Sequence, residues 1–232
     1  EGAERTCFIV HGYFDHSGLY KKMIDYLLHR GCHVVVFDLP GHGLSSGKQA
    51  DINSFGDYVF VLRRCLEFFY KKTPSPWHVV AQSTGAAIVM DYLLSQQVDE
   101  ETGPFERVLL LAPLVRPARW LGIRVLHGFL RPWLPSIKRK FTECSHDAQF
   151  VDFVANDPLS SSRLPVSWVT ALIRWVKRFH TLSWSHTELL VVQGTGDHTV
   201  DWKYNLKAIA DKFPKAKFMQ INGAKHHLVA ES

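Results

Sequence analysis

A serine between an apolar run and a helix-like run is the residue of this sequence best placed for nucleophilic chemistry. Trp77–Ala81 is apolar, Ser83 follows two residues later, and small residues fill the first turn after it. Ala81 and Gly85 would let the backbones of a strand and a helix approach closely. The N-terminus of that helix would offer free N–H groups to an oxyanion. The alternative is a buried strand followed by a helix with an ordinary serine near its N-cap.

A serine hydroxyl attacks a carbonyl at neutral pH when a base removes its proton and a third group orients that base. Asp197 is the candidate for the third group, because it lies on a glycine-containing loop directly after the apolar run Glu188–Gln193. Three other acidic residues could supply the carboxylate, but their surroundings are typical of solvated charges or helix caps. These are Asp147, Asp152 and Asp157.

Two adjacent histidines are candidates for the base. His226 and His227 lie on a turn after the last apolar run, and only one of two neighbours can face Ser83. His198 is a poor candidate, since it adjoins Asp197 and neighbouring side chains on an extended loop point apart. The sequence predicts a triad of Ser83, Asp197 and His226, with His227 as the alternative base.

Two backbone amides are candidates for an oxyanion hole. The Thr84 amide follows the candidate nucleophile, and the Tyr13 amide lies in the loop after the first apolar run. An unusual backbone angle at Gly12 would turn the Tyr13 amide toward the site. The alternative for this loop is an ordinary tight turn.

Six short apolar runs alternate with helical patterns, which predicts an open, mostly parallel sheet with helices on both faces. The expected strands are Thr6–Val10, His33–Phe37, Trp77–Ala81, Arg107–Ala112, Glu188–Gln193 and Ala216–Ile221. The expected helices are Leu19–Arg30, Ser54–Lys72, Gly85–Gln97 and Trp202–Phe213. The candidate residues follow the ends of these strands. Because ligands of such sheets bind beyond the carboxyl ends of the strands, the elements would bring the candidates to one edge.

Residues 114–187 separate the fourth and fifth expected strands. They hold 11 lysines and arginines and 4 acidic residues, a net charge of +7 against +5 for the whole chain, and five of the seven tryptophans. We interpret them as a helical cap inserted into a core of residues 1–113 and 188–232. The run Trp120–Arg131 and the basic residues 138–140 would contact an anionic membrane surface or line an acyl tunnel. Alternatively, the tryptophans form the core of the cap and its charges face water.

Composition excludes several classes of protein. With 232 residues, 46% of them hydrophobic, the chain can bury the core of one domain. No apolar run reaches the ~18 residues that a membrane span needs. The four widely spaced cysteines predict buried, reduced thiols of a cytoplasmic protein rather than disulfides or a zinc site. Nucleic-acid binding is not indicated, since the sequence has no recognised motif for it.

The candidate residues, together with further stretches, resemble the monoacylglycerol lipase and lysophospholipase branch of the α/β-hydrolases. Residues 11–20 resemble the HGxGEHSxRY motif of that branch, residues 38–45 its DxxGHGxS motif, and residues 156–159 a motif of many caps. Residues 223–226 are similar to the GAxH motif that carries the base, which favours His226. The resemblance implies an α/β-hydrolase fold, in which serine, acid and histidine follow one another in this chain order.

This sequence departs from the branch at several positions. Phe14 and Asp15 stand where Gly-Glu is common, Leu19 stands where Arg is common, and the serine turn reads Ala-Gln-Ser-Thr-Gly instead of Gly-His-Ser-Met-Gly. These departures concern the substrate preference more than the reaction. The branch also has a hairpin before the first strand and a helix after the last one, and their absence here suggests a trimmed domain.

The residues and the resemblance together imply a serine hydrolase that cleaves carboxylic esters of monoacylglycerol or lysophospholipid through an acyl-enzyme intermediate. No metal or organic cofactor is implied. Two alternatives stay open: a small-ester esterase or aminopeptidase of the same fold, and a non-catalytic lipid-binding protein. The expected location is cytoplasmic, with peripheral membrane contact through the basic cap. The head group, the acyl-chain length and the oligomeric state are not specified by the sequence.

Overall fold

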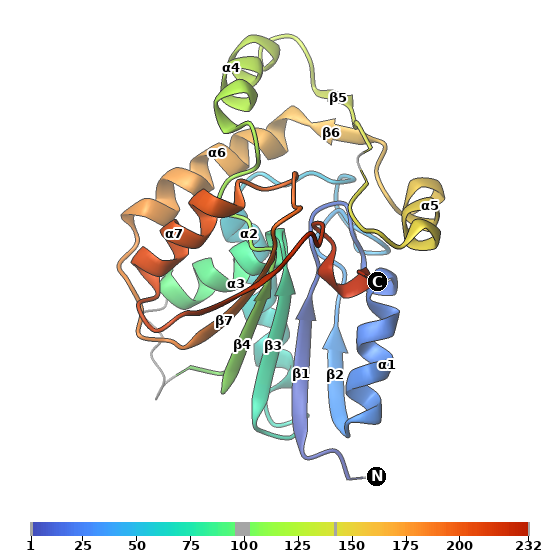
Figure 1. The fold of residues 1–232 in the computed structure, drawn as a ribbon, viewed down its shortest axis with the longest axis vertical. Coiled ribbons are helices and arrows are strands. Elements are labelled where there is room, and N and C mark those ends of the chain that lie inside the picture. The colour runs from blue at the N-terminus through green and yellow to red at the C-terminus, as the bar shows by residue number, and fades with distance from the viewer. Residues whose placement is uncertain (1, 96–102, 142, 232) are drawn as a thin grey trace.

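A sheet of six strands forms the centre of the protein in a computed structural model (Figure 1). The structure describes residues 2–95, 103–141 and 143–231. The strands are β1 (Arg5–Val10), β2 (Cys32–Val36), β3 (Trp77–Gln82), β4 (Arg107–Leu111), β7 (Leu189–Gly194) and β8 (Lys217–Ile221). Their order is β2-β1-β3-β4-β7-β8, and all neighbouring pairs are parallel. The predicted α/β fold class is confirmed, and each strand lies within one residue of its expected bounds.

Helices cover both faces of the sheet. One face packs against α2 (Phe55–Phe69), α3 (Thr84–Ser95), α6 (Val166–Thr181) and α7 (Trp202–Lys212). The other face packs against α1 (Lys21–His29) and the short 3-10 turns η1 (Ser17–Tyr20) and η2 (Leu228–Ala230). Because successive strand residues point to opposite faces, Val79 lies in the first core and Val80 in the second.

The helices match the expected runs with two differences. The run expected over residues 19–30 begins as the 3-10 turn η1 and continues as α1. The helix expected over residues 85–97 is α3, which ends at Ser95, and residues 96 and 97 lie outside the described part of the chain. α2 begins with a capping box, in which Ser54 and Asp57 each bind the backbone of the other.

The edge strand β8 corrects the prediction that all six strands are covered on both faces. Every residue of β8 is exposed, and Phe218, Met219 and Ile221 are 39%, 53% and 43% exposed. An apolar run predicts burial only where other elements pack on the strand, and a strand at the end of the sheet has fewer such neighbours.

The 114–187 segment lies above the carboxyl ends of the strands (Figure 1). It contains α4 (Trp120–Leu130), β5 (Ser136–Lys138), α5 (Ala148–Asn156), β6 (Arg163–Pro165) and α6. The antiparallel pair of β5 and β6 was not expected from the helical patterns. Trp168 and Trp175 of α6 are buried in the same core as α2 and α3, whereas Trp133 and Trp184 are 81% and 56% exposed. The tryptophans therefore do not form a separate core of the segment.

All four cysteines are free, and two of them, Cys7 and Cys32, are buried. The other two, Cys65 and Cys144, are half-buried, which corrects the expectation that all four are buried. Burial raises the pKa of Cys7 to about 12 and that of Cys144 to about 11, so these side chains are neutral thiols at pH 7. None of the described helices is long and apolar enough to cross a membrane.

Candidate active site

Ser83 occupies the turn between β3 and α3 with an unusual backbone conformation. Its φ is +52°, in a region that non-glycine residues rarely adopt. The Ser83 amide donates to the Leu111 carbonyl of β4 at 2.9 Å, and the Ser83 carbonyl accepts from the amides of Ala87 and Leu114, each at 3.1 Å. These bonds on both sides of the residue hold the turn in this conformation.

Gly85, in the first turn of α3, is required by close packing. A Cβ at this position would lie 2.2 Å from the Val10 carbonyl oxygen and 2.6 Å from that of His11. A side chain does not fit there, so the glycine lets α3 approach the end of β1. The sequence analysis predicted the close approach, but its partner is β1 rather than the strand that carries Ser83.

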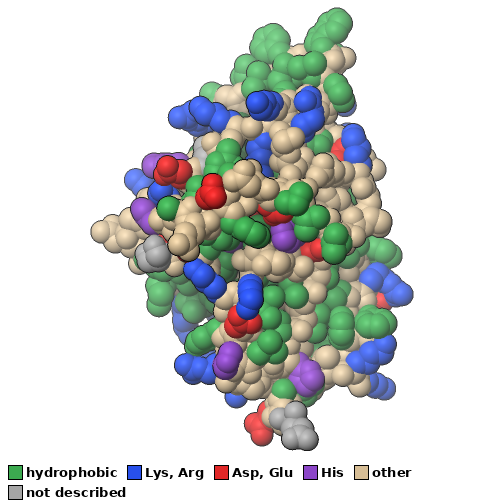
Figure 2. Space-filling model, turned by 90° about the vertical axis from the view of Figure 1, so that its right-hand side faces the viewer, with side chains coloured by type: hydrophobic (Ala, Val, Ile, Leu, Met, Phe, Trp, Pro, Cys, Tyr) green, Lys and Arg blue, Asp and Glu red, His purple; other side chains and the backbone are tan. Residues whose placement is uncertain are grey.

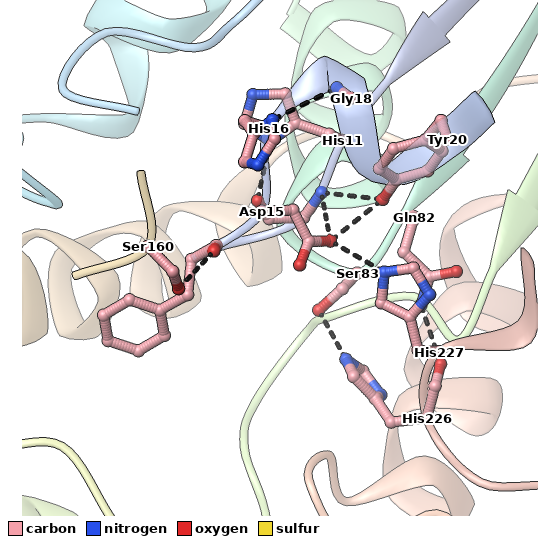
Figure 3. A network of polar contacts seen from close by, with 12 residues as sticks. His11, Asp15, His16, Gly18, Tyr20, Gln82, Ser83, Ser160, His226 and His227 are labelled. Carbon is pink, nitrogen blue, oxygen red and sulfur yellow. Dashed lines mark hydrogen bonds and ion pairs between the residues drawn. The ribbon is translucent and has the colours of Figure 1, made fainter. Parts of the chain in front are cut away.

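Ser83, His226 and Asp197 form a continuous chain of hydrogen bonds. His226 Nε2 lies 3.0 Å from Ser83 Oγ (Figure 3), and His226 Nδ1 lies 2.7 Å from Asp197 Oδ2. The amides of Thr199 and Val200 donate to Asp197 Oδ1 at 2.7 and 3.2 Å. When Nδ1 carries the proton and donates it to Asp197, the Nε2 lone pair faces the serine hydroxyl. This arrangement can remove the proton of Ser83.

Burial and charge shift the pKa values of both His226 and Asp197. Burial opposes the charged form of Asp197, but the adjacent His226 and hydrogen bonds from Gln193 and Thr199 lower the pKa of the carboxyl below its usual value. Burial also opposes a charge on His226, but Asp197 raises the pKa of the ring above its usual value. An ionised Asp197 therefore stabilises the imidazolium that forms when His226 accepts a proton.

His227 faces away from Ser83, toward a second carboxylate (Figure 3). Its Nε2 lies 3.3 Å from Asp15 Oδ2, and its ring packs against those of Tyr20 and Phe150. Neither ring nitrogen has a hydrogen bond of good geometry to a described residue. Of the two adjacent histidines, the structure brings His226 to Ser83.

Gln82 fixes the chain at these two histidines. Its side-chain Nε2 donates to the His226 carbonyl at 2.7 Å, and Gln82 is itself buried at the end of β3. The sequence analysis recorded this glutamine only as a departure from a motif. Its position beside the serine was the available signal.

The other acidic and histidine candidates lie elsewhere. His198 and Asp152 are exposed, and Asp147 is the N-cap of α5, where its side chain accepts from the Phe150 amide. Asp157 corrects the prediction of a solvated or capping carboxylate. Its side chain is 4% exposed, and its Oδ2 lies 2.7 Å from His16 Nε2. Asp157 thus connects the 114–187 segment to the loop after β1.

The predicted oxyanion residues Tyr13 and Thr84 both line the cavity that contains Ser83. Thr84 is the first residue of α3, so its amide has no acceptor within the helix. Among the described residues, neither the Tyr13 amide nor the Thr84 amide donates a hydrogen bond outside regular helix and strand pairing. Both amides can therefore donate to a negatively charged oxygen beside Ser83.

The prediction for Gly12 is wrong in its physical reason. The φ angle of Gly12 is not positive, whereas that of Phe14 is +67°. Space requires the glycine instead, because a Cβ at Gly12 would lie 2.8 Å from Asp15 Oδ2 and 3.3 Å from Ser83 Cβ. The loop after β1 passes directly beside the serine.

A buried polar network around Asp15 was missed by the sequence analysis (Figure 3). Asp15 Oδ2 accepts from the Tyr20 hydroxyl at 3.0 Å and from the Gly12 amide at 3.2 Å. Burial opposes ionisation, but the adjacent His227 and the Tyr20 hydroxyl lower the pKa of Asp15 below its usual value. An ionised carboxylate therefore holds the loop that carries the Tyr13 amide. The signal in the sequence was Asp15 at the acidic position of the HGxGEHSxRY motif.

The second resembling stretch, residues 38–45, holds the same loop from the other side. Asp38 accepts from the amides of Ser17 and Leu44 at 2.7 and 2.9 Å, and His11 Nε2 accepts from the Leu39 amide at 2.8 Å. Burial lowers the pKa of His42 to about 4, so this histidine is neutral at pH 7. This stretch therefore has a structural role.

A mostly apolar cavity of about 470 Å³ adjoins Ser83 and His226. Much of its wall comes from the 114–187 segment, through α4, α6 and the basic residues at the end of β5 and directly after it. The residues of this segment that line it include Ile123, Leu126, His127, Leu130, Lys138, Arg139, Lys140, Trp168, Val169 and Leu172. The described residues contain no cluster of His, Cys, Asp and Glu side chains that could hold a metal ion.

α4 presents different residues to the cavity and to solvent. His127 lines the cavity, and its Nε2 lies 2.7 Å from Thr170 Oγ1, whereas Arg124 and Arg131 are exposed. Leu121 and Phe129 are 73% and 71% exposed. Two large apolar side chains of this helix thus face solvent and not the cavity.

The parallel sheet, the strained serine and the serine–histidine–aspartate chain of hydrogen bonds define an α/β-hydrolase. The chain belongs to the family of the serine aminopeptidases S33, whose family model matches residues 1–232. It is 24% identical to the phospholipase YtpA of Bacillus subtilis over 205 residues, which cover 83% of this chain and 76% of that protein. It is 26% identical to human monoglyceride lipase over 233 residues, 96% of this chain and 75% of that protein.

Solved structures with the same fold include two further lipases. The monoacylglycerol lipase of Paleococcus ferrophilus superposes with a TM-score of 0.81 at 21% identity, over 97% of this chain and 87% of that chain. A monoglyceride lipase of Saccharomyces cerevisiae, solved with a substrate analogue, superposes with a TM-score of 0.80 at 16% identity, over 100% of this chain and 82% of that chain. At these identities the superpositions show the fold. Together with the sequence relatives, they confirm the resemblance to the monoacylglycerol lipase and lysophospholipase branch.

Proposed function

We propose that this protein is a serine hydrolase that cleaves carboxylic esters of single-chain lipids through an acyl-enzyme intermediate. The observation that carries the proposal is Ser83 Oγ at 3.0 Å from His226 Nε2, with His226 Nδ1 at 2.7 Å from Asp197 Oδ2, beside an apolar cavity. A bound ester would meet an activated hydroxyl and an apolar wall in the same place.

The residues divide the reaction into two steps. Ser83 Oγ attacks the ester carbonyl while His226 takes the hydroxyl proton, and the Tyr13 and Thr84 amides stabilise the tetrahedral oxyanion. The carbon–oxygen bond to the alcohol then breaks, and His226 gives its proton to the leaving alcohol. A water molecule, deprotonated by His226, attacks the acyl-Ser83 ester in the same way and releases the fatty acid. Asp197 orients His226 and stabilises its charged form in both steps.

The shape and lining of the cavity support a substrate with one acyl chain. Its volume of about 470 Å³ lies within the usual range for small-molecule sites, and its wall is dominated by aliphatic and aromatic side chains. An aminopeptidase would need a carboxylate for the ammonium group of its substrate. Asp15 lines the cavity, but its Oδ2 is already bonded to Tyr20 and Gly12. The lining therefore favours lipid esters over peptides.

We further propose that residues 114–187 act as a cap on a core formed by residues 1–113 and 188–232. They supply much of the cavity wall, and Tyr13 of the loop after β1 stacks on Trp168 of α6 with ring centroids 3.7 Å apart. The cap would cover the acyl chain and contact the loop that carries one oxyanion donor.

We also propose that the outer side of α4 contacts lipid surfaces. Leu121, Phe129 and Trp133 are 73%, 71% and 81% exposed, and Arg124 and Arg131 are exposed beside them. Figure 2 shows hydrophobic side chains gathered at the end of the molecule where α4 lies, with lysines and arginines just below. This combination is typical of helices that lie in an anionic membrane interface. The free cysteines fit the cytoplasmic location that we propose for the protein.

The membrane contact is tested by co-flotation with vesicles of phosphatidylcholine and phosphatidylglycerol. Replacing both Leu121 and Phe129 by Ser should reduce the bound fraction several-fold, since each removes apolar area from the contact. Phe68→Ser, at a residue 60% exposed on α2, is the matched control and should leave binding unchanged. Equal binding of the double variant and the wild type would contradict a contact through α4.

The hydrolase proposal is tested by release of fatty acid from monoacylglycerol and of p-nitrophenol from esters of increasing acyl length. We expect turnover that rises with acyl length and is abolished in Ser83→Ala. A preference for acetyl esters would identify a small-ester esterase, and turnover of aminoacyl amides instead of esters would identify an aminopeptidase. Binding of fatty acid without any turnover would identify a non-catalytic lipid-binding protein.

A further inference from the structure

A positively charged side chain lies in the wall of the apolar cavity. Arg139, directly after β5, lines the cavity together with Ser83, and its guanidinium carbon lies 4.0 Å from the centre of the Phe14 ring. Its Nη1 donates to Ser160 Oγ at 2.8 Å. The side chain is half-buried, and burial lowers the pKa of its guanidinium below the usual value. Arg139 is thus a partly desolvated cation at the substrate site.

Arg139 has no acidic partner among the residues that the structure describes. Other arginines of the chain do: Arg116 lies 2.7 Å from Asp201, and Arg178 lies 3.1 Å from Asp91. The negative charge of Asp15 acts from a distance to raise the pKa of Arg139, but among the described residues the two side chains form no ion pair. Nε and Nη2 of Arg139 donate no hydrogen bond to any residue that the structure describes. A partly buried cation without a counter-ion is costly, unless a bound molecule supplies the negative charge.

The contacts of Arg139 place this charge close to the reacting ester. Ser160 Oγ, which accepts from Arg139, donates to the Phe14 carbonyl at 3.1 Å. Phe14 follows Tyr13, whose amide is the proposed oxyanion donor. A guanidinium on the ring of Phe14 is therefore next to the loop that would bind the ester carbonyl. The apolar part of the cavity takes the acyl chain, so the charge faces the alcohol part of an ester.

We propose that Arg139 determines specificity by binding a phosphate group in the alcohol part of the substrate. The inference rests on the proposed function and names its substrate class: single-chain esters whose alcohol carries a phosphate. The free edge of the guanidinium, Nε and Nη2, can donate paired hydrogen bonds to phosphate oxygens, which a lysine cannot reproduce. Lys138 and Lys140 are exposed at the cavity on either side of Arg139 and add long-range attraction for the same group.

The test compares two substrates with the same short acyl chain, octanoyl glycerol and octanoyl glycerol phosphate, at concentrations where both are monomeric. Attraction to an anionic lipid surface then plays no part. In Arg139→Met, which keeps the packing on Phe14, we expect the ratio of kcat/KM for the phosphate ester over the neutral ester to fall about 10- to 100-fold. Arg139→Lys should retain part of the ratio. Lys177→Gln removes an exposed charge from the same segment and should leave it unchanged.

The outcomes separate this inference from the hydrolase proposal. If Arg139→Met and Arg139→Lys each lower kcat/KM equally for both esters, Arg139 only supports the loop beside it, and the inference is overturned. An unchanged ratio would overturn it as well. Hydrolysis by the wild type of the neutral ester alone would overturn the inference and leave the proposed function intact. Hydrolysis of neither ester, nor of any longer ester, would overturn both.

Discussion

The adjacent histidines His226 and His227 each lie beside a carboxylate, and the two pairs differ in what their histidines can reach. In the first pair, His226 is hydrogen-bonded to Asp197 on one nitrogen and to Ser83 on the other. In the second pair, His227 lies 3.3 Å from Asp15 without good hydrogen-bond geometry, and its remaining nitrogen has no partner among the described residues. Neighbours in sequence thus have opposite orientations.

The difference teaches that a buried carboxylate beside a histidine does not by itself make a catalytic base. Asp197 and His226 can act on a nucleophile because the strained turn holds Ser83 Oγ 3.0 Å from His226 Nε2. Asp15 instead binds the amide of Gly12 and the hydroxyl of Tyr20, so its charge holds a loop in place. We infer that the first pair moves protons and the second positions an oxyanion donor.

Removing each histidine in turn should give the largest contrast. We expect His226→Ala to lower kcat/KM for ester hydrolysis by about 10⁴- to 10⁶-fold, as loss of a triad member does, because no base remains for Ser83. His227→Ala should lower it by about tenfold or less. Steady-state hydrolysis of one p-nitrophenyl ester measures both. A larger loss of kcat/KM in His227→Ala than in His226→Ala would show that His227, and not His226, is the base.

Replacing the two carboxylates should separate catalysis from support. Asp197→Asn is expected to lower kcat by about 10³- to 10⁴-fold, since the amide no longer favours the correct tautomer of His226. Asp15→Asn is expected to lower kcat by about tenfold and to reduce the free energy of unfolding by about 1–3 kcal/mol, because charged hydrogen bonds to Gly12 and Tyr20 are weakened. Kinetics and urea denaturation measure the two effects. The reverse ranking of the kinetic effects would contradict the division of roles.

The pH dependence should show a smaller but diagnostic difference. The pKa of His226 is raised by Asp197 and, to a smaller extent, by Asp15. Protonated His226 cannot accept the serine proton, so kcat/KM should fall as the pH drops through this raised pKa and be constant above it. The acidic limb should move to lower pH in Asp197→Asn and move less in Asp15→Asn. An acidic limb at the same pH in all three proteins would show that it does not report His226.

The sequence was informative wherever one local pattern determines the structure. The apolar runs predict the inner strands most directly, because burial between two helical layers leaves a continuous signal, as at Trp77–Gln82. The ends of parallel strands meet at one edge, so polar residues after β3, β7 and β8 could be grouped before any coordinates were known. Ser83, Asp197 and His226 are brought together by this topology.

The rest depends on contacts between segments far apart in the chain. Nothing local distinguishes Asp15 as the partner of His227, or Asp157 as the partner of His16. The first pair joins the loop after β8 to the loop after β1, and the second joins the residue after α5 to that same loop. The role of Gly12 was misjudged for a related reason: the space around it is limited by the folded position of the Asp15 side chain and by Ser83 from another part of the chain. Exposure of β8 likewise depends on which elements pack beside it.

Capture of the acyl-enzyme analogue tests the central claim most directly. After treatment with an alkyl fluorophosphonate, peptide mass mapping should find one phosphonyl adduct, on Ser83 of the wild-type protein. Labelling should be absent in Ser83→Ala, greatly slowed in His226→Ala and close to normal in His227→Ala. An adduct on another residue, or labelling of Ser83 that does not depend on His226, would contradict the account.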